Sequence, residues 1–104
     1  MPMNEELSRR PGYTALVTFL PGSAGGRRSP VSSGYAAQFE VEGQKRIPAM
    51  QTFEDELLVY PGDTVPAQIT LLADVNPGIF YEGLSFRFFE GEKLAGTGVI
   101  TGIL

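Results

Sequence analysis

The chain has 104 residues, the length of one domain, and 42% of them are hydrophobic, which is enough to form a core. It contains no cysteine and no histidine, which excludes disulfides and thiolate chemistry and removes the commonest general base and metal ligand. A net charge of −4 argues against nucleic-acid binding driven by charge alone. The lack of cysteine, of a long apolar run and of a signal-peptide pattern predicts a cytoplasmic protein that does not span a membrane.

Apolar residues recur at period two in several segments, which predicts β-strands, and no segment carries the 3.6-residue period of an amphipathic helix. Residues 1–11 are predicted to form a flexible tail, and residues 12–104 one folded domain. In chain order, the predicted strands are residues 13–20, 35–41, 56–60, 65–72, 84–88 and 93–104, of which 35–41 and 56–60 carry the weaker patterns.

The connections between these segments are typical of an antiparallel all-β protein. Pro61-Gly62 predicts a tight turn, and Gly91-Glu92 predicts a two-residue hairpin. Glycines in the last segment indicate bulges or bends, where a sheet curls. Six short strands with such bends predict a closed antiparallel β-barrel, because closure removes exposed strand edges. A β-sandwich is the alternative.

Basic residues occur in adjacent pairs, which makes local binding sites conceivable in an acidic chain. Of these pairs, Arg27-Arg28 is the best candidate, because arginine presents a rigid donor fork that matches phosphate or carboxylate. The glycines before it let the backbone approach a ligand closely. The alternative is a solvated loop whose arginines form salt bridges with nearby acids.

No constellation of residues predicts catalysis. The segment at residues 22–29 lacks the Lys-Ser/Thr end of a nucleotide-binding loop, and no helix follows Gly96-Thr97-Gly98. The acids at 54–56 and at Glu90 and Glu92 are poorly placed for paired catalysis, since adjacent strand residues point to opposite faces. We therefore expect a non-enzymatic protein without metal, cofactor or nucleotide.

Three blocks of the sequence resemble one known protein family. They are GGRRSPVSSGYAAQF (25–39), VYPGDTVPAQITLL (59–72) and EGLSFRFFEGEKLAGTGVITGIL (82–104). In this order they resemble the third, C-terminal β-barrel domain of elongation factor Tu, over residues 13–104. The resemblance implies a six-stranded antiparallel barrel without a catalytic role, which in the family contacts aminoacyl-tRNA, the guanine-nucleotide domain and elongation factor Ts.

The resemblance also implies where a contact surface would lie. The RNA-contacting loops of the family correspond to Arg27, Arg28 and the Glu90-Gly91 turn. Arg28 replaces a histidine of the family pattern, and Phe89 replaces a basic residue. Lys45 and Arg46 would extend this surface if they converge with Arg27 and Arg28, whereas neutralisation by Glu40, Glu42 or Glu92 would weaken it.

Two functions follow as expectations. The first is a stand-alone binding module related to translation, which contacts tRNA, other RNA or a translation-factor protein through the Arg27-Arg28 loop. The second is a barrel kept as a scaffold for a protein partner unrelated to translation, since fold does not imply function.

Overall fold

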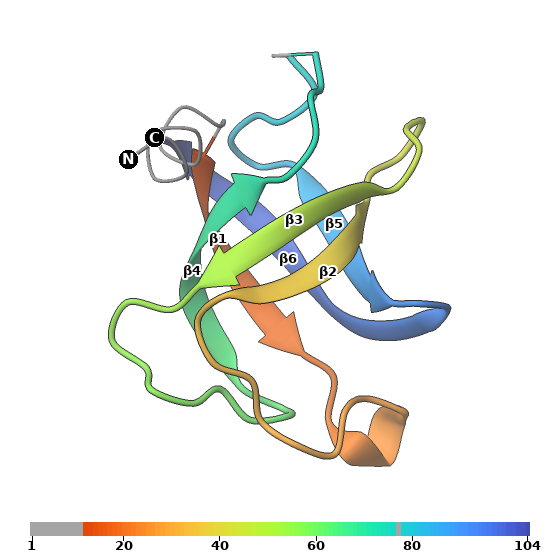
Figure 1. Cartoon of the computed structure of the whole chain (residues 1–104), viewed down its shortest axis with the longest axis vertical. Coiled ribbons are helices and arrows are strands. Elements are labelled where there is room, and N and C mark those ends of the chain that lie inside the picture. The colour runs from red at the N-terminus through yellow and green to blue at the C-terminus, as the bar shows by residue number, and fades with distance from the viewer. Residues whose placement is uncertain (1–11, 77) are drawn as a thin grey trace.

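A computed structural model describes residues 12–76 and 78–104 and shows an all-β fold (Figure 1). The strands are β1 (Gly12–Phe19), β2 (Tyr35–Glu40), β3 (Ile47–Thr52), β4 (Thr64–Leu71), β5 (Ser85–Glu90) and β6 (Lys93–Ile103), with a short 3₁₀ turn, η1, at Gly22–Ala24. They form a closed barrel in the order β1-β4-β3-β2-β5-β6, and every neighbouring pair is antiparallel. The predicted barrel is confirmed and the sandwich alternative is wrong. The predicted tail lies outside the described residues.

The barrel closes around apolar side chains supplied by alternate positions of each strand. Phe19, Phe39, Phe86 and Phe88 are buried, and the rings of Phe39 and Phe86 stack with centroids 4.5 Å apart. Such offset stacking adds to the free energy gained by removing the rings from water. The apolar alternation seen in the sequence is therefore the pattern of the barrel interior.

The glycines of β6 make room for these rings. A Cβ atom at Gly96 or Gly98 would lie 2.4 Å from the ring of Phe88 or Phe86, respectively. The register also shifts between Phe88 and Phe89, where β5 meets β6. The irregular β6 predicted from its glycines is thus confirmed, with close ring packing as an added reason for them.

The predicted strand at residues 56–60 is wrong, and β3 was missed. Val59 forms only an isolated bridge with Val31, and residues 53–58 form a loop. The alternating apolar pattern of a strand is interrupted in β3, because its inward residues include the polar Gln51. It also contains Pro48, which lacks a backbone N–H. Pro48 is tolerated at the end of the β3–β4 ladder, where its carbonyl accepts a bond from the N–H of Leu72.

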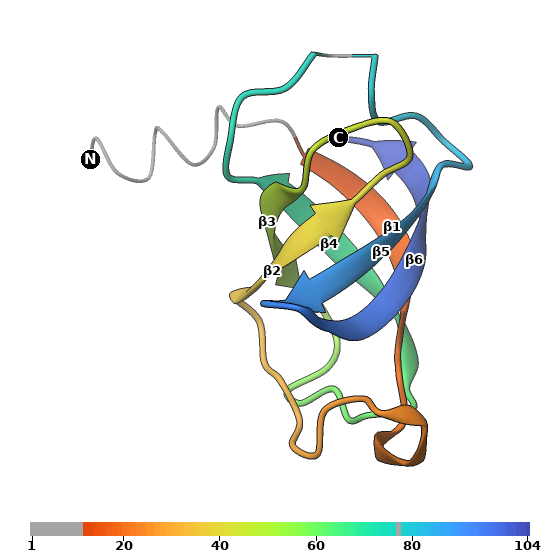
Figure 2. The same cartoon turned by 90° about the vertical axis from the view of Figure 1, so that its right-hand side faces the viewer.

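The connections gather at the two ends of the barrel (Figure 2). At one end, the β1–β2 and β3–β4 connections are tied together by the Val31–Val59 bridge. The β2–β3 and β4–β5 connections lie at the other end (Figure 2). None of the described residues belongs to a helix long and apolar enough to cross a bilayer.

Candidate functional site at the β5–β6 turn

The six residues predicted to bind RNA or a partner come from three connections of the barrel. Arg27 and Arg28 precede β2, Lys45 and Arg46 precede β3, and Glu90-Gly91 leads into the β5–β6 turn. The structure brings Arg27 to Glu90 and Arg46 to Gly91. Arg28 and Lys45 are exposed, and neither has an ion-pair partner within residues 12–76 and 78–104.

Arg27 and Tyr35 both bind the carboxylate of Glu90. Nη1 of Arg27 lies 2.5 Å from Oε2 of Glu90, and the hydroxyl of Tyr35 donates a hydrogen bond of 2.6 Å to the same oxygen. Arg27 is itself positioned by Ser29, whose carbonyl and hydroxyl oxygens accept bonds from its guanidinium. A charge-assisted pair between partly buried groups is stronger than one at an open surface. These bonds hold the β1–β2 connection against the end of β5.

The proton equilibria of this cluster follow from its geometry. Partial burial by itself would raise the pKa of Glu90, but the hydrogen bonds from Tyr35 and Arg27 and the nearby positive charges hold that pKa below its usual value. Burial, followed by the hydrogen bond and negative charge of Glu90, raises the pKa of Tyr35 above its ordinary value. At neutral pH the cluster is therefore a neutral phenol and an ion pair.

Arg46 binds the other side of the same turn. Its Nη1 donates a hydrogen bond of 2.9 Å to the carbonyl of Gly91, and its Nη1 also lies 3.9 Å from the carboxylate of Glu92. Gly91 has a φ of +60°, a conformation that glycine adopts without a Cβ penalty and that a two-residue hairpin requires. The predicted hairpin is thus confirmed, and arginines from two other connections hold it.

Phe89 lies on the outside of the barrel yet is buried, with only 7% of its surface exposed. It shares the outward side of β5 with Ser85 and Arg87, and it pairs with Gln38 of β2. The guanidinium carbons of Arg46 and Arg87 lie 3.9 Å and 5.3 Å from its ring centroid. The two arginines therefore cover the ring as cation–π partners.

Glu40 completes this cluster from β2. One of its carboxylate oxygens accepts hydrogen bonds from Arg87, and the other lies 3.8 Å from Nε of Arg46. One carboxylate thus bridges two arginines that would otherwise repel each other above the same ring. Such a network is worth more than isolated surface pairs.

The four basic residues predicted to form one surface do not make a free basic patch. Arg27 is engaged by Glu90, and Arg46 is shared between Glu40 and Glu92. The structure thus neutralises half of the predicted contact surface with acids of the same chain. What the arrangement does is to fix the β5–β6 turn in one conformation, with Arg28, Lys45 and Lys93 exposed.

Sequence reasoning missed the bond of Tyr35 to Glu90 and the burial of Phe89, whereas it named Glu40 and Glu92 as acids that could neutralise the basic pairs. The position of Phe89 was visible as a departure from the family pattern, but its burial was not. Glu40 lies opposite Arg87 in the β2–β5 register, so its second bond, to Arg87, became visible only when these two strands were paired.

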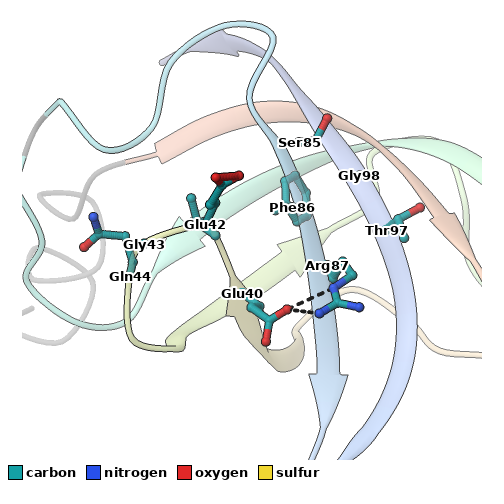
Figure 3. Close-up of a pocket in the computed structure, with 10 residues that line it drawn as sticks. Glu40, Glu42, Gly43, Gln44, Ser85, Phe86, Arg87, Thr97 and Gly98 are labelled. Carbon is teal, nitrogen blue, oxygen red and sulfur yellow. Dashed lines mark hydrogen bonds and ion pairs between the residues drawn. The ribbon is translucent and has the colours of Figure 1, made fainter.

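Beside this cluster lies an open polar depression of about 670 Å³. Figure 3 shows Glu40 bound to Arg87 at one side of it, with Glu42, Gln44, Ser85 and Thr97 around the rest. Its floor is formed by Phe86 and Gly98, whose close packing belongs to the core. Among the described residues that line the depression, Glu40 is bound to two arginines, which leaves no free pair of carboxylates for acid–base chemistry.

Among residues 12–76 and 78–104, no group of three acids converges in the way that a metal ion requires. No protein-family model matches the chain. The resemblance to elongation factor Tu therefore rests on the sequence blocks, and the barrel agrees with what that resemblance implies. A six-stranded barrel by itself does not identify a family.

Proposed function

We propose that this chain is a non-catalytic binding module, built on a barrel like the third domain of elongation factor Tu, and that its partner is a protein. The β5–β6 turn and the connection that carries Arg28 form the contact surface. The observation that carries this proposal is the engagement of Arg27 and Arg46 by Glu90, Glu40 and Glu92.

Occupied arginines favour a protein partner over RNA. Affinity for RNA backbone comes from cations that replace the counterions of phosphates, and a guanidinium already paired with a carboxylate contributes little to that exchange. A turn held in one conformation suits protein recognition, because less conformational entropy is lost when it binds. Exposed Arg28, Lys45 and Lys93 then serve as polar contacts at the rim of an interface.

The family resemblance favours a cytoplasmic partner from the translation apparatus. A barrel that resembles this domain would compete for proteins that the domain contacts, and elongation factor Ts is the first to test. A partner unrelated to translation is the alternative within the same class of function. Weak RNA binding through Arg28 is the alternative of another class, because Arg28 is exposed and has no acid partner among the described residues.

The test is a pulldown of purified elongation factor Ts and of tRNA with the immobilised chain, at low and at high salt. We expect retention of the protein to change little with salt, since an interface of mixed apolar and polar contacts is not governed by counterion release. Arg28→Ala should weaken retention, whereas Glu42→Ala, an exposed residue away from the turn, should not.

Retention of tRNA that is lost at high salt and in Arg28→Ala would support the RNA alternative instead. If neither molecule is retained, elongation factor Ts and tRNA are both excluded as partners. The remaining proposal is then a scaffold for an unrelated protein, to be tested with the same Arg28 variant.

A further inference from the structure

A groove of about 350 Å³ follows the outer face of β4, far in sequence from the residues of the candidate site. Its floor is residues 64–68 of β4, and one wall is the acidic segment at residues 54–56 in the β3–β4 loop. The other wall is formed by Thr14 and Thr101, whose hydroxyls are joined by a hydrogen bond of 2.9 Å. Among the described residues that line the groove, only the three acids carry a charge.

The groove exposes a strand edge inside an otherwise closed barrel. β3 ends at Thr52, which pairs with Gln68, whereas β4 begins at Thr64 (Figure 1). Residues 64–67 therefore have β1 on one side and no strand on the other. In the described chain, no backbone hydrogen bond joins the loop residues 54–58 to this edge.

The backbone groups that face the open side can be identified from the ladder. The carbonyl of Asp63 accepts a bond from the N–H of Phe19, so residue 63 faces β1. Because neighbouring residues of an antiparallel strand face opposite sides, Thr64 and Pro66 direct their backbone groups to the open side. The edge thus offers two carbonyl acceptors and, since proline has no N–H, the single donor of Thr64.

The charges of the residues that line the groove indicate which kind of peptide segment would fit it. Glu54, Asp55 and Glu56 are exposed, and none of the ion pairs within the described residues involves them. Next to them, Leu57 is 88% exposed. A second copy of this chain would bring its own acids and its own proline to the same edge, which disfavours self-association there.

We propose that this groove binds an extended, basic segment of a partner protein, whose backbone pairs with the open edge of β4 between Thr64 and Pro66. Lysine or arginine side chains of the segment pair with the acids at 54–56, and its apolar side chains lie against the floor at Pro66. At about 3.3 Å per residue, an edge of this length accommodates a segment of about four residues. Addition of a strand to an exposed edge is a known mode of peptide recognition, in which main-chain bonds supply affinity.

The probe is a short fluorescein-labelled peptide of alternating lysine and valine, titrated with the full chain at low salt and followed by fluorescence anisotropy. We expect binding tighter than about 1 mM, and no binding of the matched peptide of alternating glutamate and valine. In ¹⁵N-labelled protein, the amides of residues 64–68 should shift, and the amide of Thr64 should exchange more slowly in the complex.

Two variants locate the binding. Gln68→Lys places a positive charge on the floor of the groove at an exposed position and should abolish binding, whereas Gln44→Lys adds the same charge in the exposed β2–β3 turn and should leave it unchanged. Glu54→Gln combined with Glu56→Gln should weaken binding by about fivefold, as expected for exposed charge pairs.

The proposal is overturned if no binding is detected, if the acidic peptide binds equally well, or if Gln68→Lys and Gln44→Lys behave alike. Shifts confined to the Arg28 surface would also overturn it while leaving the function proposed for that surface standing.

Discussion

The guanidinium carbon of Arg46 lies 3.9 Å from the ring centroid of Phe89, so a residue of the β2–β3 connection covers an aromatic ring on the outside of β5. Phe89 stands where the elongation factor Tu pattern that the sequence resembles has a basic residue. In this chain the position is aromatic. The positive charge beside it belongs to Arg46, which Glu40 holds in place. The same arginine that sequence reasoning assigned to partner binding thus stabilises the barrel.

The Arg46–Phe89 contact predicts a specific loss of stability. Arg46→Ala removes the cation–π contact and the bond to Gly91, and should lower the free energy of unfolding by about 1–2 kcal/mol. Lys45→Ala, at the exposed neighbouring position, should change it by less than about 0.5 kcal/mol. Urea denaturation of both variants measures the difference, and equal midpoints would contradict the stabilising role of Arg46.

The ion pair of Glu90 predicts loss of stability in acid. Its pKa is lower in the folded than in the unfolded chain, so its contribution is complete above the unfolded value of about 4.3 and is lost as pH falls through the folded value. Glu90→Gln should therefore flatten the decline in unfolding free energy below about pH 5, whereas Glu42→Gln, at an exposed turn position, should not. Denaturation curves across this pH range that decline in parallel for the wild type and Glu90→Gln would refute the assignment.

The raised pKa of Tyr35 predicts that stability is lost at alkaline pH. Because its pKa is raised in the folded chain, its contribution is complete below the unfolded value of about 10 and is lost as pH rises above it. Absorbance at the phenolate band should show Tyr35 ionising only as the protein unfolds, and Tyr35→Phe should remove that step. Ionisation of Tyr35 before unfolding would contradict the burial of the Tyr35–Glu90 bond.

The burial of Gln51 predicts that an apolar side chain at this position would stabilise the fold. It points into the barrel with 0% of its surface exposed, and neither its amide nitrogen nor its amide oxygen has a hydrogen-bond partner among residues 12–76 and 78–104. A buried polar group without a partner costs about 1–3 kcal/mol, so Gln51→Met should raise the free energy of unfolding by about 1–2 kcal/mol. Gln38→Met, at an exposed position of β2, should have little effect. A loss of stability in Gln51→Met would mean that the amide is satisfied inside the barrel, and a buried water would be the partner to seek.

The close contact between Gly98 and Phe86 predicts that a larger residue at position 98 would overpack the barrel interior. A Cβ atom there would lie 2.4 Å from Cζ of Phe86, so Gly98→Ala should lower stability by about 1–3 kcal/mol through displacement of the ring. Gly78→Ala is the matched control, because no heavy atom lies within 4 Å of the added methyl group. Thermal unfolding of the two variants tests the comparison, and a neutral Gly98→Ala would show that the strand can move away from the ring.

The sequence by itself determined the class of fold and most of its strands. Period-two alternation identifies β1, β4 and β5 because their inward residues are apolar and most of their outward residues are polar or small. It failed at β3, where inward positions hold Ala49 and Gln51 and a proline interrupts the run, so that the nearby apolar segment at residues 56–60 looked more like a strand. Only the closure of the barrel makes a strand of residues 47–52, because β2 and β4 both need a partner there.

The candidate site was determined only in part by the sequence. The family resemblance assigned Arg27 and the Glu90-Gly91 turn to one surface, and Arg46 was expected to extend that surface if the basic pairs converge. The structure brings Arg27 and Arg46 to this turn. Which charges face solvent and which face each other was decided by tertiary structure alone. The physical reason is that an ion pair depends on distances of a few ångströms between side chains. Here those side chains come from connections and strands that lie far apart in the sequence, and only the closed barrel sets the distances between them.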